Sequence, residues 1–479
     1  MARTKQTAGR TTSGYAKPAQ LSGHKRHRSS STEILTSRSS SPLSSCPPSP
    51  ELQPMTISKE SNTFCYLCHD GGRTFICSNS ACPRVVCDVC IDILESIATR
   101  LGNQEISFKC PACHEKEERA AHSKPMPYFA FTQIVQGKSV PACSMPTFVK
   151  GICERASKSQ VRGGPILILH FVCTGLNTRG GIPRLLNAAL EEYYTEATLP
   201  YLEVVFDFGT QHKLRHWQAE AQHLATTIGE DTFQQKIFFI SVHSEVTRGD
   251  LFAGKDEGGM TWLYCPRRLF MDYLFAGRLQ LLVSGATMFM LSCGPLVTFL
   301  QSICSFKEVL LELRPAYTIT FGTTHFIGAV IKSFIVAFGG RVVIQGHDLG
   351  EVFTDLLNVS VELPMHTDAY LFQVEEQMAS GMPNPSSSAI HIKGMHYSWY
   401  HTHHRPWGCP LPMSCLKCSS IHSWSPSKQG KDSSGAPGRI STCQSPACGF
   451  QMFSYQPRSY QVIKVKVGEG MGWIKQAGI

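Results

Sequence analysis

Charge is scarce in this chain. Only 17% of its 479 residues are Asp, Glu, Lys or Arg, below the roughly one quarter usual in soluble domains. The shortage excludes a long coiled coil, which needs charged residues along its exposed positions. An apolar signal segment is also missing, because the chain begins with the polar sequence MARTKQTAGR. Without an export signal we expect a reducing compartment, where grouped cysteines serve as metal ligands or reactive thiols rather than as disulfides.

The positive charge is concentrated at the N-terminal end. The formal net charge is +9 at pH 7, and residues 1–40 contain eight Lys and Arg against the single Glu33. Those residues therefore carry +7, and the rest of the chain carries only +2. A DNA-binding groove needs basic side chains on a folded surface, so direct DNA binding is not indicated.

Long hydrophobic runs are also few. Residues 279–306 contain no charged side chain, which is long enough to raise the hypothesis of a membrane span. Gly294 and Pro295 interrupt the run, so a buried strand, a turn and a helix explain it better. Hydrophobic residues make up 42% of the chain, enough for a folded core. We therefore expect no interaction with a membrane.

Composition divides the chain into segments. Residues 1–60 are rich in Ser, Thr and Pro, and we expect them to be disordered. Two cysteine-rich segments, 62–116 and 405–455, flank a large segment, 162–375, in which apolar runs alternate with amphipathic stretches. That alternation predicts an α/β domain with a mainly parallel sheet. Residues 376–404 are interpreted as a linker.

Apolar runs mark the expected strands of the α/β domain, and the stretches between them mark the expected helices. The strands are expected at 165–172, 202–208, 236–243, 286–293, 317–321 and 341–346. The helices are expected near 182–195, 212–228, 265–280, 295–313 and 324–338.

The N-terminal residues Ala2 to Ala8 read ARTKQTA. This peptide resembles the start of the histone three tail, residue for residue. Lys5 falls where the histone has its first methylatable lysine, whereas Arg10 stands where the second would be. The resemblance implies chromatin association, with histone tails or histone-tail readers as partners. The basic run HKRHR at 24–28 is typical of nuclear import signals. We therefore expect a nuclear protein, or otherwise a cytoplasmic one.

The first cysteine-rich segment has the spacing of a double zinc site. Zinc takes four soft ligands in tetrahedral geometry, and two cysteines separated by two residues supply a pair from one tight turn. Eight cysteines therefore fit two ions. They are Cys65, Cys68, Cys77, Cys82, Cys87, Cys90, Cys110 and Cys113.

This spacing, together with the sequences CHDGG at 68–72 and CPRVVCDVC at 82–90, resembles a PHD finger, and particularly its ADD branch. Cys87 replaces the histidine usual in that family. The resemblance implies a crossed ligand arrangement, in which Cys65, Cys68, Cys87 and Cys90 bind one ion and Cys77, Cys82, Cys110 and Cys113 bind the other. Such fingers either read histone tails or only support neighbouring domains, and both alternatives stay open here.

The second cysteine-rich segment predicts a zinc ribbon. Its ligands would be the pairs Cys415 with Cys418 and Cys443 with Cys448, and Cys409 is an alternative. With the first segment this makes about three Zn²⁺ per chain. A ribbon alone does not indicate what it binds.

Two chemically competent residues end predicted strands of the α/β domain. His243 ends the strand at 236–243, and Cys293 ends the strand at 286–293, 50 residues later. The carboxyl ends of parallel strands are where α/β folds place their reactive groups. A thiol needs a nearby base and an oxyanion donor to act as a nucleophile, and Gly294 would let its amide approach the oxyanion.

The run AYTITFGTTHFIGAVIKSFIVAF at 316–338 resembles the CHAT branch of the caspase clan. In that clan the base histidine lies about 50 residues before the nucleophile, so the resemblance implies that His243 and Cys293 are catalytic. Ser244 stands where the family prefers glycine. The alternative is that Cys293 is a small buried hydrophobic residue.

The predicted fold class is therefore α/β: a caspase-like, mainly parallel sheet domain flanked by two small zinc-binding modules and a disordered N-terminal tail. Two functions fit. One is a cysteine endopeptidase in which finger and tail govern recruitment or autoinhibition. The other is a non-catalytic chromatin reader or decoy with an inactive protease fold. In either case the finger is expected to bind the chain's own peptide Ala2 to Ala8, with Asp70 or Asp88 pairing with Lys5.

Overall fold

The computed structural model describes most of the chain beyond its first 63 residues. The described residues are 64–70, 73–79, 82, 84–93, 97, 100, 106–121, 124–150, 163–229, 232–377, 389–421, 423–464 and 470–479. The predicted disordered tail at 1–60, with the histone-like peptide, lies outside them and stays a prediction. The parts of the chain are described below one at a time.

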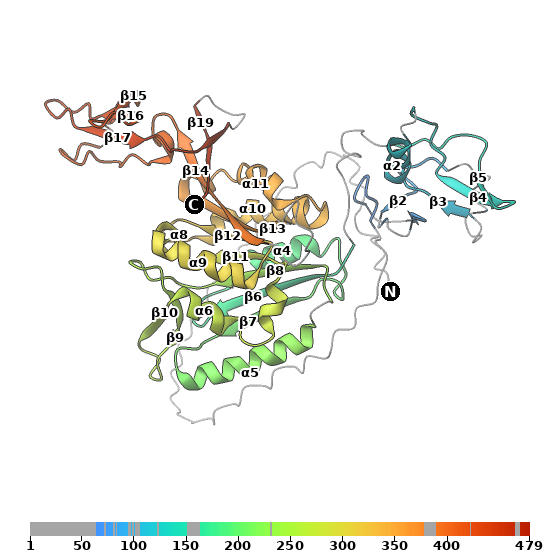
Figure 1. The fold of residues 1–479 in the computed structure, drawn as a ribbon, viewed down its shortest axis with the longest axis horizontal. Helices are drawn as coiled ribbons and strands as arrows, with labels where there is room; N and C mark the ends of the chain where they lie inside the picture. Colours follow the sequence, from blue (N-terminus) through green and yellow to red (C-terminus); the bar gives the residue numbers. More distant parts are fainter. Residues whose placement is uncertain are drawn as a thin grey trace, which may run out of the picture. The chain divides into compact units, whose positions relative to one another are not determined.

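A nine-stranded mixed sheet organises the central domain (Figure 1). Its order is β18-β19-β14-β13-β12-β11-β8-β6-β7. The strands β7, β6, β8, β11 and β12 are parallel, and β13, β14, β19 and β18 continue the sheet antiparallel. The predicted α/β class is confirmed, with a parallel core inside a mixed sheet. The parallel strands are β6 (Ile166–Cys173), β7 (Tyr201–Phe206), β8 (Gln235–Ser241), β11 (Thr287–Leu291) and β12 (Tyr317–Phe321).

Helices cover both faces of this sheet (Figure 1). The strands β6, β8 and β11 are consequently buried on both sides and read as continuous apolar runs, which is why the sequence predicted them well. One face packs on α5 (Gln211–Ile228), α6 (Arg267–Leu274), α7 (Leu279–Val283) and α9 (Leu300–Leu313). The other packs on α4 (Ile182–Leu190), α10 (Lys332–Phe338) and α11 (Leu349–Leu357).

The strand expected at 341–346 is wrong. Three helical elements follow one another here: the short 3₁₀ helix η1 (Gly328–Ile331), then α10, then a π-helical turn, η2, formed by Gly339–Ile344. Val343 and Ile344 are buried there in the hydrophobic cluster that also holds α4 and α11. Burial of two adjacent apolar residues in a helical turn produced a run that resembles a short buried strand.

The linker expected at 376–404 contains a strand of the central sheet. β13 (Ala369–Gln377) and β14 (Ala389–His401) pair antiparallel, and β14 then pairs with β19 (Met471–Ala477). The last strand, β18 (Gln461–Lys464), pairs with β19. The second cysteine-rich module is therefore inserted between two strands of one sheet. It contains β15 (Lys428–Lys431), β16 (Pro437–Thr442) and β17 (Gln451–Tyr455).

The first cysteine-rich module is built from short elements around a small hydrophobic cluster. The cluster reaches beyond residue 116, because Phe131 is buried in it and Val149 packs against it. The described elements are β1 (Thr74–Ile76), β2 (Val85–Cys87), β3 (Ile106–Phe108), α2 (Pro111–Ala120), β4 (Phe131–Val135) and β5 (Lys138–Pro141).

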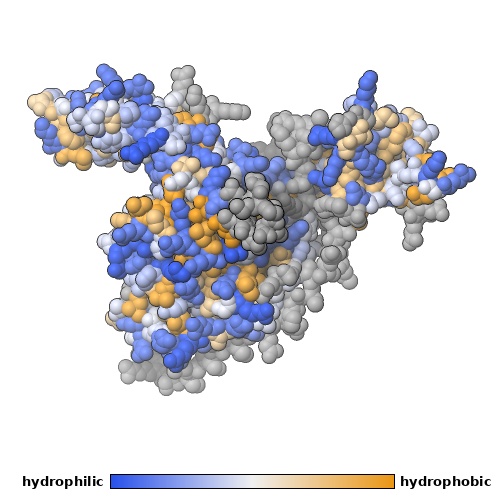
Figure 2. Space-filling view, in the orientation of Figure 1, coloured by the Kyte–Doolittle hydropathy of each residue, from blue (hydrophilic) through white to orange (hydrophobic). Residues whose placement is uncertain are grey.

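The charge-free run at 279–306 folds as α7, β11, the short helix α8 (Pro295–Thr298) and the start of α9. Within the described residues, every helix is too short or too polar to cross a membrane. Figure 2 shows hydrophobic residues at the surface lying among hydrophilic ones.

Two further short elements belong to this domain: the hairpin of β9 (Leu251–Lys255) and β10 (Trp262–Cys265), and the helix α12 (Leu363–His366).

Candidate metal centres and catalytic edge

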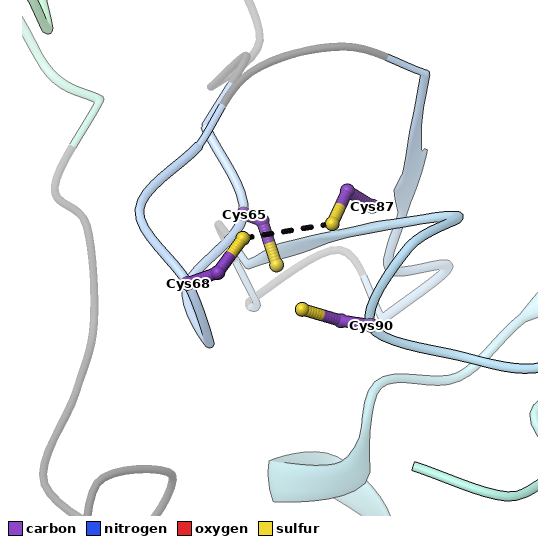
Figure 3. Close-up of side chains that lie close together, drawn as sticks. All are labelled: Cys65, Cys68, Cys87 and Cys90. Carbon is purple, nitrogen blue, oxygen red and sulfur yellow. Dashed lines mark hydrogen bonds between the residues drawn. The ribbon is translucent and has the colours of Figure 1, made fainter. Parts of the chain in front are cut away.

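Twelve cysteines gather into three groups of four. Within each group the sulfur atoms all lie within 4.8 Å of one another. In the first module the two groups alternate along the chain, which is the crossed arrangement that the PHD-like resemblance implied. Figure 3 shows the first of them. The three groups are Cys65, Cys68, Cys87 and Cys90; Cys77, Cys82, Cys110 and Cys113; and Cys415, Cys418, Cys443 and Cys448.

The sulfur–sulfur distances match zinc coordination. Four sulfurs at about 2.3 Å from a central ion, at the corners of a tetrahedron, lie about 3.8 Å apart. The observed separations are 3.6 Å between Cys68 and Cys87 and 3.7 Å between Cys82 and Cys110. In the third group Cys418 and Cys443 are 3.7 Å apart. A disulfide would bring two sulfurs to about 2.05 Å, so the groups are consistent with three Zn²⁺ ions.

Similar backbone turns present the first cysteine pair of the first and third groups. The amide of Cys65 donates to the carbonyl of Asp70 at 2.9 Å, and that of Cys415 donates to Ser420 at 2.9 Å. The residue after each pair has a positive φ, 62° at His69 and 58° at Ser419. This left-handed residue reverses the chain so that both sulfurs of the pair point the same way.

The chemistry of the clusters favours a cation. Burial raises the pKa of Cys90 and Cys110, and the neighbouring thiolates raise it further. Four such groups do not all ionise together without a positive charge between them. Backbone amides contribute too, as Leu67 donates to the sulfur of Cys65 at 3.4 Å and Cys110 donates to that of Cys77 at 3.5 Å. A zinc ion held by the four sulfurs would supply that positive charge.

Cys409, the alternative ligand of the ribbon, lies outside the third cluster. Its amide donates to the carbonyl of Pro406 at 3.1 Å, in the 3₁₀ turn η3 (Pro406–Gly408) that precedes the ribbon. The four remaining cysteines complete the tetrahedron, so a fifth is not needed.

The candidate catalytic residues follow neighbouring parallel strands. β8 and β11 pair with Ser241 opposite Leu291, so His243 and Cys293, each two residues further on, leave the same edge of the sheet. The register persists beyond the strands, because the amide of Val242 donates to Leu291 at 3.3 Å. His243 is exposed and Cys293 is half-buried.

Ser244, the residue after His243, is buried and makes a specific contact. Its hydroxyl donates to the carbonyl of Cys293 at 3.1 Å. The serine therefore ties the segment that carries His243 to the residue it would activate.

The backbone amide of Gly294, expected to be an oxyanion donor, is already hydrogen-bonded within the protein. Its amide donates to the carbonyl of Thr323 at 2.5 Å, in the loop that follows β12. A Cβ atom at position 294 would lie 2.2 Å from the carbonyl oxygen of Gly322. Glycine is thus required by a close approach of two loops, which differs from the role expected for it.

A buried polar network also lies in the parallel part of the sheet. His170 is only 2% exposed, and its Nε2 lies 2.8 Å from the hydroxyl of Ser241. Burial lowers the pKa of His170 to about 4, against the influence of Glu203. Although burial opposes it, hydrogen bonds from Arg184, Tyr201 and Thr178 lower the pKa of Glu203 to about 2. His170 is therefore a neutral core histidine at pH 7.

Fold and sites together define a zinc-binding α/β protein with three four-cysteine centres. No family model matches the chain, and no curated protein matches it significantly. The likeness to PHD and CHAT families rests on the motifs quoted above.

Proposed function

We propose that the central domain is a cysteine peptidase of the caspase-like, CHAT type, with Cys293 as nucleophile and His243 as base. One observation carries the proposal: the two residues leave adjacent parallel strands in register, at one edge of the sheet. Carboxyl edges of this kind hold the chemistry of open α/β sheets. The contact between Ser244 and the carbonyl of Cys293 adds a second tie between the two segments.

The chemistry follows from the two side chains. His243 takes the proton of the Cys293 thiol, and the thiolate attacks the carbonyl carbon of a peptide bond. The imidazolium returns the proton to the leaving amine, which departs as the thioester forms. Water, deprotonated by the same histidine, then hydrolyses the thioester and restores the thiol.

Competitive alkylation tests the dyad. At pH 6, Cys293 is expected to react roughly tenfold faster than Cys304, because a paired histidine stabilises the thiolate. Cys304 is the matched control, since it is exposed and lies on α9 of the same domain. His243→Ala should bring the rate of Cys293 down to that of Cys304. Mass spectrometry reads both rates in one sample. Equal rates in the unaltered protein would contradict the dyad.

A non-catalytic scaffold is the alternative, and one observation favours it. The amide of Gly294 is bonded to Thr323 and so does not point into an oxyanion site. Under this alternative the protein is a chromatin reader or decoy, and His243→Ala leaves the reactivity of Cys293 unchanged.

For the finger we propose recognition of the peptide Ala2 to Ala8. The segment of Cys65 and Tyr66 contacts β2, so among the described residues β1 is the outer strand of its small sheet. An extended peptide binds such an edge by adding a strand. The amide of Asp88 donates to Arg73 at 3.1 Å, which places Asp88 beside the start of β1. Lys5 would pair with Asp88, or with the exposed Asp70.

Deletion of residues 2–9 tests this proposal. A linked peptide competes at an effective concentration near millimolar, so the deletion should raise the affinity of the finger for a synthetic ARTKQTA peptide about tenfold. In the protein lacking residues 2–9, Asp88→Asn should weaken binding of the synthetic peptide. Asp70→Asn in the same protein tests Asp70 as the alternative partner of the peptide lysine. Fluorescence anisotropy measures all four affinities. Equal affinity with and without residues 2–9 would refute self-binding.

A further inference from the structure

An ion pair with little exposure lies at the stem of the second cysteine-rich module. Arg405 follows β14, and its Nη2 lies 2.7 Å from Oδ1 of Asp368, which precedes β13. The side chains are 18% and 22% exposed. The other two guanidinium nitrogens of Arg405 are also hydrogen-bonded. Nη1 donates to the carbonyl of Pro364 and Nε donates to that of Gly408, both at 3.0 Å. Such a multiply bonded arginine fixes the geometry of what it contacts.

Asp368 in turn holds the loop after β12. Its carbonyl accepts the amide of Gly322 at 3.0 Å and the hydroxyl of Thr367 at 2.8 Å. The same Thr367 hydroxyl accepts the amide of Thr323 at 3.0 Å. Two consecutive amides of this loop are therefore fixed by the turn that contains Asp368.

The loop after β12 contacts Gly294, the residue that follows the candidate nucleophile Cys293. Thr323 accepts the amide of Gly294 through its carbonyl, and position 294 has no room for a side chain against Gly322. Cys293 is the adjacent residue. A continuous series of contacts thus runs from Arg405 through Asp368 and the loop at 322–323 to Cys293.

His396 completes the arrangement on the β14 side. Its Nε2 lies 3.0 Å from Oδ2 of Asp368, and its ring stacks on Tyr370 with centroids 4.5 Å apart. Both carboxylate oxygens of Asp368 are consequently used. The aspartate is held from two points of the chain and has one available orientation.

We infer that Arg405 and Asp368 are positioning residues for Cys293: through them the stem of the second zinc module holds the loop that packs against Gly294, the residue after Cys293. The inference deepens the proposed peptidase function and rests on it for its catalytic meaning. The contact series itself is independent of whether Cys293 reacts. Neither residue touches the thiol, so both act through Gly322, Thr323 and Gly294.

Hydrogen exchange and alkylation test the inference together in the full-length zinc-loaded protein. Arg405→Gln removes the charge and the fork geometry, and should speed amide exchange in peptides covering 317–328 about tenfold. Alkylation of Cys293 at pH 6 should slow by roughly the same factor, because small displacements of reacting groups are costly. Arg405→Lys, which keeps the charge, should change the exchange rate and the alkylation rate less than Arg405→Gln does. Peptides covering β8 report global stability and should be unchanged.

Arg341→Gln is the matched control, because Arg341 pairs with Asp355 at the same 2.7 Å but on the exposed surface of η2 and α11. It should change neither measurement by more than about twofold. Unchanged exchange at 317–328 in Arg405→Gln overturns the inference, whatever Cys293 does. Faster exchange with unaltered alkylation overturns the positioning of Cys293 where His243→Ala does slow alkylation. Where His243→Ala has no effect, the same result supports the hold of Arg405 on the loop and refutes the dyad.

Discussion

Replacing Cys110 by serine is expected to remove one of three zinc ions and to unfold the part of the first cysteine-rich module around that ion. Cys110 is fully buried in the group with Cys77, Cys82 and Cys113. The module has a small hydrophobic cluster, and structural zinc contributes about 10–16 kcal/mol to folding of such units. The zinc content should fall from three to two per chain, and amides of β3 and β4 should lose their protection from hydrogen exchange.

The control for this experiment is Cys143→Ser. Cys143 packs against the same hydrophobic cluster but belongs to no group of four. That variant should retain three ions and normal protection. If Cys110→Ser also kept three ions with unaltered exchange, the assignment of the second cluster as a zinc site would be wrong.

Under the proposed peptidase function, replacing Cys293 by alanine is expected to abolish peptide cleavage. Loss of the nucleophile in an enzyme of this kind lowers kcat by roughly 10⁴-fold or more. The measurement is product formation from a synthetic peptide library, read by mass spectrometry, with Cys304→Ala as the variant that keeps activity. Cleavage that survives in Cys293→Ala would exclude this thiol as the nucleophile. An unaltered protein without any cleavage, combined with ordinary alkylation of Cys293, would favour the scaffold alternative.

The cysteine spacing carried the most information about the sites. Two cysteines separated by two residues fit one turn of backbone, as the hydrogen bonds around Cys65 and Cys415 show, and zinc imposes the same demand wherever it binds. The pairing between distant cysteines came from the likeness to PHD fingers, because spacing alone does not say which pairs share an ion. We predicted Gly294 as an oxyanion donor, whereas in the structure it allows a close approach to Gly322. That contact is set by the tertiary fold and leaves no sign in the local sequence.

Strands buried on both faces were predicted, and those at the antiparallel end of the sheet were missed. β6 is buried throughout and apolar except for His170, whereas β14 buries alternate residues such as Met395, Tyr397 and Trp399. That alternation is a strand signal, but histidines, a lysine and a glycine surround it and resemble a linker. The π-helical turn at Gly339–Ile344 was mistaken for a strand because its burial depends on α4 and α11.

The insertion of the ribbon between β14 and β19 sets an order for assembly during synthesis. A ribosome makes β13 and β14 first, so β14 waits with an unpaired edge until the whole ribbon and then β19 have emerged. An exposed edge of this kind is prone to pair with other chains. Zinc capture by the four ribbon cysteines draws the ends of the inserted segment together before β19 arrives, which lowers the entropy lost on closing the loop. We therefore expect zinc to shorten the time between the synthesis of β19 and its pairing with β14, and so the time for which this edge is open to other chains.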